Sequence, residues 1–532
     1  MAELSENSSG YGGMKQVFTI SLALFIIFLD GSIVNIALPS IIKEYSTDLG
    51  MASWIINAYV ITVAVFLVFM GKIGDMLGRA KFYNIGLVMF MLSSFFCALS
   101  TNVEMLILFR FFQGISGAIV IPTSMSLVRT AVPPEKVGSA MGVWGAVGGL
   151  AIAIGPALGG VITEVSDWRW MFYINLPVIT IALFLNKRIF QHLREKTQPL
   201  HFDVWGTITL SVTLFVLIYT VTKGPDVGWM SWPIIGGFTF SILGVGVFYW
   251  IEHKISYPLV DFELFTNKLY VVGLISNLLG GILLAGMMMI LPILLTEAME
   301  FTSLQAAYFI TPLSAAMLIT APVTGRLIDR FGFFVPMIIG YIISVIGFYL
   351  LTSLELNTPT LSILWRIGVI GVGIAMIAVT SLTVSTVSVQ SSQSSVASGI
   401  FAMVRNVGGA IGVSLFVSVI MTSFNHLSMV SIQDSIQQIH STSLSTYEKS
   451  KLTDALKAQQ VSFFDRNYTS HLESLEISKN NLGEWKKMIS DLRDQEQKNK
   501  VTAIHYAFIF GMLLSIFFSI SAMFLLKKSF RL

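Results

Sequence analysis

The sequence has 532 residues, of which 54% are hydrophobic and only 12% carry a charged side chain, against about a quarter in soluble domains. This composition excludes a water-soluble globular protein and indicates an all-α polytopic membrane protein. A net charge of +3 gives no basis for nucleic-acid binding, and the single cysteine, Cys97, excludes an intrachain disulfide or a cysteine metal cage.

Apolar runs bounded by charges, proline or glycine predict fourteen membrane-spanning helices. They follow a polar tail, residues 1–16, and the first run is interpreted as a retained span because it lacks a small-residue cleavage site. The spans begin near Val17, Ala52, Phe82, Met105, Gly138, Trp170, Val204, Trp232, Leu269, Ser303, Phe334, Ser362, Ala397 and Val501.

The first span carries a carboxylate, Asp30, well inside an apolar helix. A lone acid within a membrane span is costly to keep ionised, so it indicates a group that loads and releases a proton. A purely structural interhelical hydrogen bond is the alternative. Arg110 in the fourth span is the expected partner, unless its side chain instead reaches the outer interface.

The loop after the second span contains Gly71, Asp75, Gly78 and Arg79. Its glycines permit a tight turn, and Asp75 can pair with Arg79 or sit at a helix N-terminus. Such a contact can form in one conformation and break in another, which predicts a gate latch. The alternative is an ordinary charged loop.

The fifth span is rich in small residues, and some of them form a stripe along one helical face. Small residues let a second helix approach closely, while a proline weakens the helical hydrogen-bond ladder. We expect a pliable packing interface at Gly149, Gly155, Pro156, Gly159 and Gly160.

The loop pattern is repeated in the second part of the chain. Gly325, Asp329 and Gly332 follow the tenth span with the spacing of Gly71, Asp75 and Gly78, and Arg330 is the neighbouring arginine. This internal repeat predicts an N-terminal six-helix bundle over 17–190, two inserted helices with flanking loops over 191–268, and a C-terminal six-helix bundle over 269–532. Two parallel halves around a midplane site form a transporter architecture.

Lysine and arginine are concentrated in alternate short loops, which predicts that both termini are cytoplasmic. The segment 425–500, between the last two spans, is then extracellular. Leucine and isoleucine at helical spacing within it indicate a short helical hairpin, and a flexible tether is the alternative.

Five motifs in order resemble the major facilitator superfamily, and more narrowly its fourteen-span drug:proton antiporters of the EmrB/QacA type. They are the string around Asp30, the loop 71–81, the segment 110–117, the glycine- and proline-rich fifth span, and the string 168–177. The resemblance implies proton coupling by Asp30 and Arg110, conformational switching by the Asp75 loop, and an antiporter motif at Gly155 and Pro156.

Polar and aromatic residues within the spans are expected to line the cavity between the two halves. They are Asn35, Asn57, Tyr59, Gln113, Arg366, Arg405 and Asn406. Relatives that export multivalent cations carry further membrane acids, whereas only Asp30 lies deep in a span here. Three substrate classes are therefore compatible with the sequence: neutral, monocationic and amphipathic anionic compounds.

The sequence thus predicts a secondary exporter of lipophilic small molecules or drugs, driven by the proton gradient, in the cytoplasmic membrane of a bacterium. It is expected to be no enzyme, to need no cofactor or metal, and to work as a monomer among membrane lipids. The alternatives are export of an endogenous lipid or amphipathic metabolite, and a membrane sensor or importer on the same fold.

Overall fold

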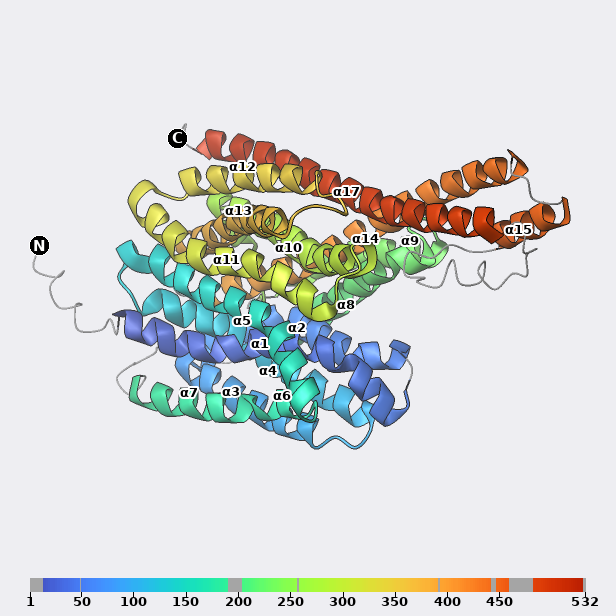
Figure 1. Cartoon of the computed structure of the whole chain (residues 1–532). Helices are drawn as coiled ribbons and strands as arrows, with labels where there is room; N and C mark the ends of the chain where they lie inside the picture. The colour runs from blue at the N-terminus through green and yellow to red at the C-terminus, as the bar shows by residue number, and fades with distance from the viewer. Residues whose placement is uncertain are drawn as a thin grey trace, which may run out of the picture.

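The computed structural model describes residues 13–47, 49–189, 203–255, 258–390, 393–441, 446–458 and 482–529. Long helices form nearly all of this part of the chain (Figure 1). Thirteen of its helical stretches are long and apolar enough to cross a membrane. The predicted number of fourteen spans is one larger and stays a prediction.

The N-half comprises the helices up to residue 189 and lies at the bottom of Figure 1. They are α1 (Gly13–Tyr45), α2 (Leu49–Leu77), α3 (Arg79–Ala98), α4 (Val103–Thr130), α5 (Val137–Val165), α6 (Trp170–Tyr173) and α7 (Asn175–Ile189). The predicted sixth span is divided, since α6 and α7 are separate helices joined at Ile174.

The C-half lies above it in Figure 1 and contains the helices from residue 268 onward. They are α10 (Lys268–Ile293), α11 (Ser303–Phe331), α12 (Phe334–Leu351), α13 (Thr360–Val387), α14 (Ser394–Ser441), α15 (Thr446–Ala458) and α17 (Leu482–Ser529). Helix α10 continues into one π-helical stretch, Leu294–Ala298.

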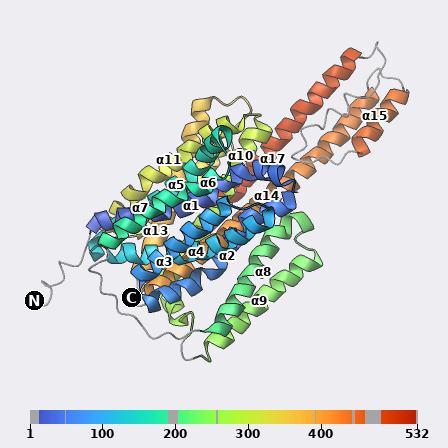
Figure 2. The ribbon, with the colours of Figure 1, turned by 90° about the horizontal axis from the view of Figure 1, so that it is seen from below.

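Two helices between the halves, α8 (Val204–Val227) and α9 (Trp232–Glu252), form an antiparallel pair at one side of the bundle (Figure 2). Gly237 and Gly244 of α9 lie directly against Thr220 and Thr213 of α8, so the two backbones approach closely. At one end of the pair, Asp203 accepts a hydrogen bond from the backbone N–H of Gly206 and caps α8, while Glu252 accepts one from the backbone N–H of Val260.

Side-chain caps and positive-φ glycines mark where several helices begin and end. Asn102 caps α4, Asn267 caps α10, and Thr302 with Gln305 forms a capping box on α11. Gly78 and Gly332 adopt φ of 93° and 76° at the turns after α2 and α11, a region that favours glycine. The two loop motifs of the sequence are therefore pseudo-equivalent sharp turns.

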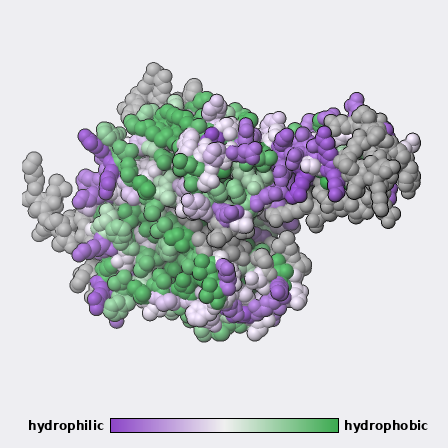
Figure 3. Space-filling view, viewed as in Figure 1, coloured by the Kyte–Doolittle hydropathy of each residue, from purple (hydrophilic) through white to green (hydrophobic). Residues whose placement is uncertain are grey.

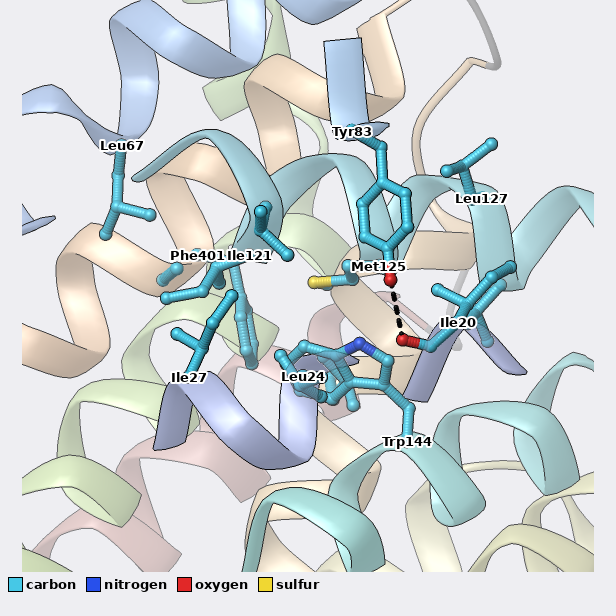
Figure 4. Packing of buried hydrophobic residues seen from close by; sticks show 14 of the residues in the cluster. Ile20, Leu24, Ile27, Leu67, Tyr83, Ile121, Met125, Leu127, Trp144 and Phe401 are labelled. Carbon is cyan, nitrogen blue, oxygen red and sulfur yellow. Dashed lines mark hydrogen bonds between the residues drawn. The ribbon is translucent and has the colours of Figure 1, made fainter. Parts of the chain in front are cut away.

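The hydrophobic core follows the two halves but is not confined to them. Around Trp144, residues of α1, α4 and α5 pack together, and Tyr83 donates a hydrogen bond to the carbonyl of Ile20 (Figure 4). Phe401 of α14 reaches into this group beside Ile27. Apolar packing thus joins the halves through α14.

Helices α14 and α17 are each 48 residues long and extend beyond the bundle. Together with α15 they form a projection at the right of Figure 1, with a small core that is assembled from all three helices. Its buried members are Ile439, Leu452, Leu456, Ile489 and Leu492. The segment 425–500 is therefore helical at both ends, while residues 459–481 in its middle lie outside the described part of the chain.

Hydrophobic and hydrophilic residues occupy different parts of the surface. Hydrophobic side chains cover much of the bundle, whereas hydrophilic ones gather on the projection and at the opposite end (Figure 3). Helix α9 shows the trend strongly, since Trp232 and Ile242 are 86% and 72% exposed. Apolar residues so exposed are stable only in a lipid environment.

Candidate functional site

A buried ion pair lies at the centre of the N-half. The Asp30 carboxylate of α1 accepts a hydrogen bond from Arg110 Nη1 of α4, with an N–O distance of 2.5 Å. Both side chains are fully buried. The arginine also donates from Nε to the carbonyl of Ile55 on α2, at 3.1 Å, so the pair fixes three helices against one another.

Neutral polar side chains complete the surroundings of the pair. Gln113 and Asn175 each donate to Asp30 Oδ1, at 3.0 and 2.9 Å, and both also contact Ser94. The ring of Tyr59 lies 4.3 Å from the Arg110 guanidinium carbon. The six side chains, which come from α1, α2, α3, α4 and α7, are called the acid network. They are Asp30, Tyr59, Ser94, Arg110, Gln113 and Asn175.

Two members of the acid network, Ser94 and Asn175, escape sequence reasoning. Asn175 stands in the string 168–177, where it reads as part of a family motif without an assigned role, and a serine such as Ser94 is common in membrane helices. The only sequence feature that marks them is a polar side chain in an otherwise apolar helix. This feature identifies a site only when the structure shows which helices pack together.

The first loop motif holds the two halves together. Asp75, near the end of α2, pairs with Arg79 at 2.8 Å through Oδ1. Its Oδ2 accepts from the backbone N–H groups of Ser395 and Val396, at 3.2 and 3.3 Å. These are the first turn of α14, where free N–H groups and the helix dipole favour an anion. A Cβ at Gly71 would lie 2.6 Å from the Ser395 carbonyl oxygen.

The second loop motif makes the mirror contact. Asp329, near the end of α11, accepts from both the backbone N–H and the hydroxyl of Ser139, at 3.1 and 2.5 Å, in the first turn of α5. Gly325 lies against the backbone of Gly138. Unlike Asp75, Asp329 forms no ion pair within the described chain, because Arg330 instead lies over the ring of Phe331.

We call these contacts the Asp75 latch and the Asp329 latch. In each, an aspartate of one half's second helix binds the N-terminus of the other half's fifth helix. Arg129 adds a third link at this end, donating to the Val389 carbonyl at 2.7 Å. The structure is therefore closed at the latch end, which is opposite to the projection.

The glycines of α5 let helices from both halves approach. Gly148 lies against Phe28 of α1, Gly149 faces Met317 of α11, and any Cβ at Gly155 would clash with Ser32 of α1. Gly160 has open space beside it, Gly159 is buried, and the Pro156 side chain lies outside the described part of the structure. Helix α5 is thus packed tightly against α1 at one level and against α11 at others.

A cavity lies between the halves, and its volume is small in this conformation. It holds about 30 Å³, enough for about two water molecules. Helices α1, α5, α11, α13 and α14 line it through Phe28, Trp144, Gly145, Gly148, Gly149, Ile152, Met317, Ala321, Ala375, Ala378, Val379, Leu382, Phe401 and Arg405. Arg405 alone among these lining residues carries a charge.

The residues expected at this cavity are distributed differently. Only Arg405 lines it; Tyr59 and Gln113 belong to the acid network. The expectation for Arg366 does not hold in this structure: its Nη1 bonds the carbonyls of Leu350 and Ser353 at the α12–α13 turn.

Two of the remaining expected residues also lie away from the cavity. Asn406 bonds the carbonyl of Ala402 on its own helix, and Asn57 is half-buried on α2 without a place in the lining. The Asn35 side chain lies outside the described residues.

A second, larger hollow opens on the side of the bundle between α2, α4 and α8. It measures about 620 Å³ and is lined almost entirely by apolar residues, including the exposed rings of Trp54, Phe111 and Phe215. Glu104 stands at its rim. Since the lining is exposed and apolar, lipid chains fit this groove, and it is separate from the central cavity.

Comparison with known proteins agrees with this geometry. Residues 20–413 match the family model of the Major Facilitator Superfamily. The chain is 31% identical over 398 residues to the multidrug transporter protein MdtP of Bacillus subtilis, covering 74% of this chain and 73% of that protein. It is 28% identical over 408 residues to the tetracenomycin C resistance and export protein of Streptomyces glaucescens, covering 76% of each.

Among solved structures, the human organic anion transporter MFSD10 superposes with a TM-score of 0.57 at 16% identity, covering 77% of this chain and 94% of that one. At this identity the likeness concerns the fold alone. The family match covers well over half of the sequence, and the helices and surface fit it. The chain therefore belongs to the major facilitator superfamily, as a multi-pass membrane transporter rather than an enzyme.

Proposed function

We propose that this protein is a proton-coupled exporter of lipophilic small molecules, of the fourteen-span drug antiporter type. The observation that carries the proposal is the buried Asp30–Arg110 pair, because it places one titratable acid inside a membrane bundle with a single counter-charge. The names of relatives, multidrug transport and tetracenomycin C export, support drugs as the cargo.

Protonation of Asp30 is the step that links the proton to the conformation. A neutral carboxyl group cannot balance Arg110, so the ion pair and the amide hydrogen bonds that favour the carboxylate loosen together. Because Arg110 joins α4 to α1 and α2, their packing changes. The acid network thus responds to one proton with a shift between helices.

Helix α1 connects this network to the cavity. Phe28 lines the cavity, and Asp30 follows two residues later, which puts the two side chains on opposite faces of the helix, about 200° apart. Phe28 packs on Trp144 and Gly148 of α5. A movement of α1 therefore changes the cavity wall and the α1–α5 contact at the same time.

The latches supply the second conformational element. We infer that the latch end is cytoplasmic, which is consistent with cytoplasmic N- and C-termini, and that both latches break when the cavity opens inward. Proton and substrate then compete for different states of one molecule, and this competition is sufficient for antiport without ATP or another cofactor.

Everted membrane vesicles test the proposal directly. With respiration maintaining an acidic interior, addition of a transported drug to vesicles containing this protein should partly collapse the pH gradient and concentrate the drug inside. Vesicles with the Asp75→Asn variant should respond much more slowly. A drug that accumulates without any change in the pH gradient would contradict proton antiport.

A further inference from the structure

Arg405 is a charged residue that the proposed proton pathway does not use. It lies on α14 one turn after Phe401, and both side chains line the central cavity. Within the described chain, its guanidinium has neither a hydrogen-bond acceptor nor an ion-pair partner. Arg110, by contrast, donates hydrogen bonds to a carboxylate, an amide oxygen and a backbone carbonyl.

An uncompensated cation in such surroundings is costly, and arginine cannot discharge by losing its proton. The acids of the neighbouring elements are already engaged: Asp30 by Arg110, Asp75 by Arg79, and Asp329 by Ser139. The charge on Arg405 therefore needs a partner from outside the protein. A guanidinium presents a planar fork of donors, which matches a carboxylate or sulfonate.

The rest of the cavity wall indicates what such an anion is attached to. Phe28, Trp144 and Phe401 offer aromatic faces, and Met317 offers a flexible thioether chain. Surfaces of this kind accommodate apolar bodies of varied shape. In this conformation the cavity has room for little more than water, so the ligand must enter when the latches are open.

We propose that Arg405 is the anion-binding residue of the central cavity and that the transported compounds are amphipathic organic acids, with one carboxylate or sulfonate on an aromatic or aliphatic body. This inference rests on the proposed export function and names its substrate class. It selects the anionic option among the three that the scarcity of membrane acids leaves open.

A matched pair of probes separates the anion from the apolar body. Anilinonaphthalene-8-sulfonate carries the sulfonate, and N-phenyl-1-naphthylamine has the same ring system without it. Binding to the full-length protein in nanodiscs is followed by quenching of tryptophan emission, with empty nanodiscs as the blank. Wild type should bind the sulfonate more tightly than the neutral amine.

Substitution of Arg405 should remove that preference. Arg405→Gln should raise the Kd for the sulfonate about tenfold to a hundredfold, as expected for a lost charged hydrogen bond, and leave the neutral amine within about twofold. Arg366→Gln is the matched control and should change neither Kd, since that arginine of α13 bonds the α12–α13 turn and does not line the cavity.

Several results would overturn the proposal: wild type that binds the sulfonate no better than the amine, or not at all; Arg405→Gln without effect; or an equal loss in Arg366→Gln. If Arg405→Gln loses both probes, Arg405→Lys decides. A retained preference for the sulfonate in that variant supports the proposal, and equal binding of the two probes overturns it.

Failure of the underlying export function gives a different pattern. Asp30→Asn should bind the sulfonate like wild type but should not accumulate it in proteoliposomes with an imposed pH gradient. If this variant accumulates the sulfonate normally, the proton-coupling proposal fails while the anion site stands.

Discussion

The two halves of the molecule hold a membrane-buried arginine in opposite ways. In the N-half, Arg110 is neutralised by Asp30 and surrounded by amides, and it does not line the central cavity. In the C-half, Arg405 faces the cavity without a partner among the described residues. Our two proposals follow from this contrast: the closed, paired site is assigned to the proton, and the unpaired charge at the cavity is assigned to the ligand.

The two latches differ in a similar way. Both use an aspartate on a helix N-terminus, but Asp75 has Arg79 as an added partner, whereas Asp329 relies on Ser139 alone. The paired carboxylate is held in place before the halves meet. We therefore expect the Asp75 latch to contribute more to closure.

The largest effect is expected when the buried arginine of each half is replaced in turn by glutamine. Arg110→Gln leaves Asp30 buried without its counter-charge and should lower the free energy of unfolding by about 3–5 kcal/mol. Arg405→Gln removes an unpaired cation and should leave stability unchanged or higher. Thermal unfolding in detergent measures both, and equal losses would contradict the contrast.

The next effect concerns the close contact of α1 and α5. Gly155→Ala puts a methyl group against Ser32, so the helices must separate, at a cost of about 1–3 kcal/mol, and transport should fall severely. Gly160→Ala is the control, because nothing lies within 4 Å of the added carbon. Similar transport by the two variants would show that the contact is unimportant.

A smaller effect is expected from replacing the aspartate of either latch. Asp75→Asn should favour the open state by about 1–2 kcal/mol, since a carboxylate at a helix N-terminus and its ion pair are lost together. Asp329→Asn should shift the equilibrium less. Spin labels on the exposed residues Lys81 and Arg326, in a Cys97→Ala background, report the separation of the halves. An unchanged distance distribution in Asp75→Asn would refute its role.

The smallest effect is at the opposite end of the N-half, where Arg169 pairs with Glu44 at 2.8 Å. The hydrogen bond from Arg169 lowers the pKa of Glu44 below its ordinary value. A lowered carboxyl pKa adds stability at neutral pH that is lost as the pH falls through it. Glu44→Gln should therefore cost less than about 1 kcal/mol at pH 7.

That difference should vanish in acid, because protonated Glu44 and glutamine are both neutral. Unfolding of wild type and Glu44→Gln at pH 7 and below the ordinary glutamate range tests this. A gap that persists unchanged at low pH would show that packing, and not charge, makes the contact.

Much of the helix order is predictable from sequence because apolar runs and charged loops follow directly from the lipid environment. The repeated loop motif predicts equivalent turns, and the structure shows both glycines at positive φ. The partners of Asp75 and Asp329 are not predictable, because backbone N–H groups of a distant helix leave no signature in side-chain identity. Roles in proton coupling and gating stay predictions.

Arginines show where sequence reasoning stops. Arg110, Arg366 and Arg405 all stand inside apolar runs, yet one is paired, one caps a turn and one faces the cavity. Depth in the membrane is readable from position along a run, but the direction of a side chain depends on which helices pack around it. In the segment 425–500, helical spacing predicts a short hairpin, but it does not predict that α14 and α17 continue from the bundle into the projection without a break.

Proton coupling by Asp30 is tested by uphill transport in proteoliposomes with an imposed pH gradient. Asp30→Asn is compared with wild type and with Glu104→Gln, which alters an exposed acid of α4. We expect Asp30→Asn to bind and exchange substrate without concentrating it, and Glu104→Gln to behave as wild type. Gradient-driven accumulation by Asp30→Asn at the wild-type level would contradict this expectation.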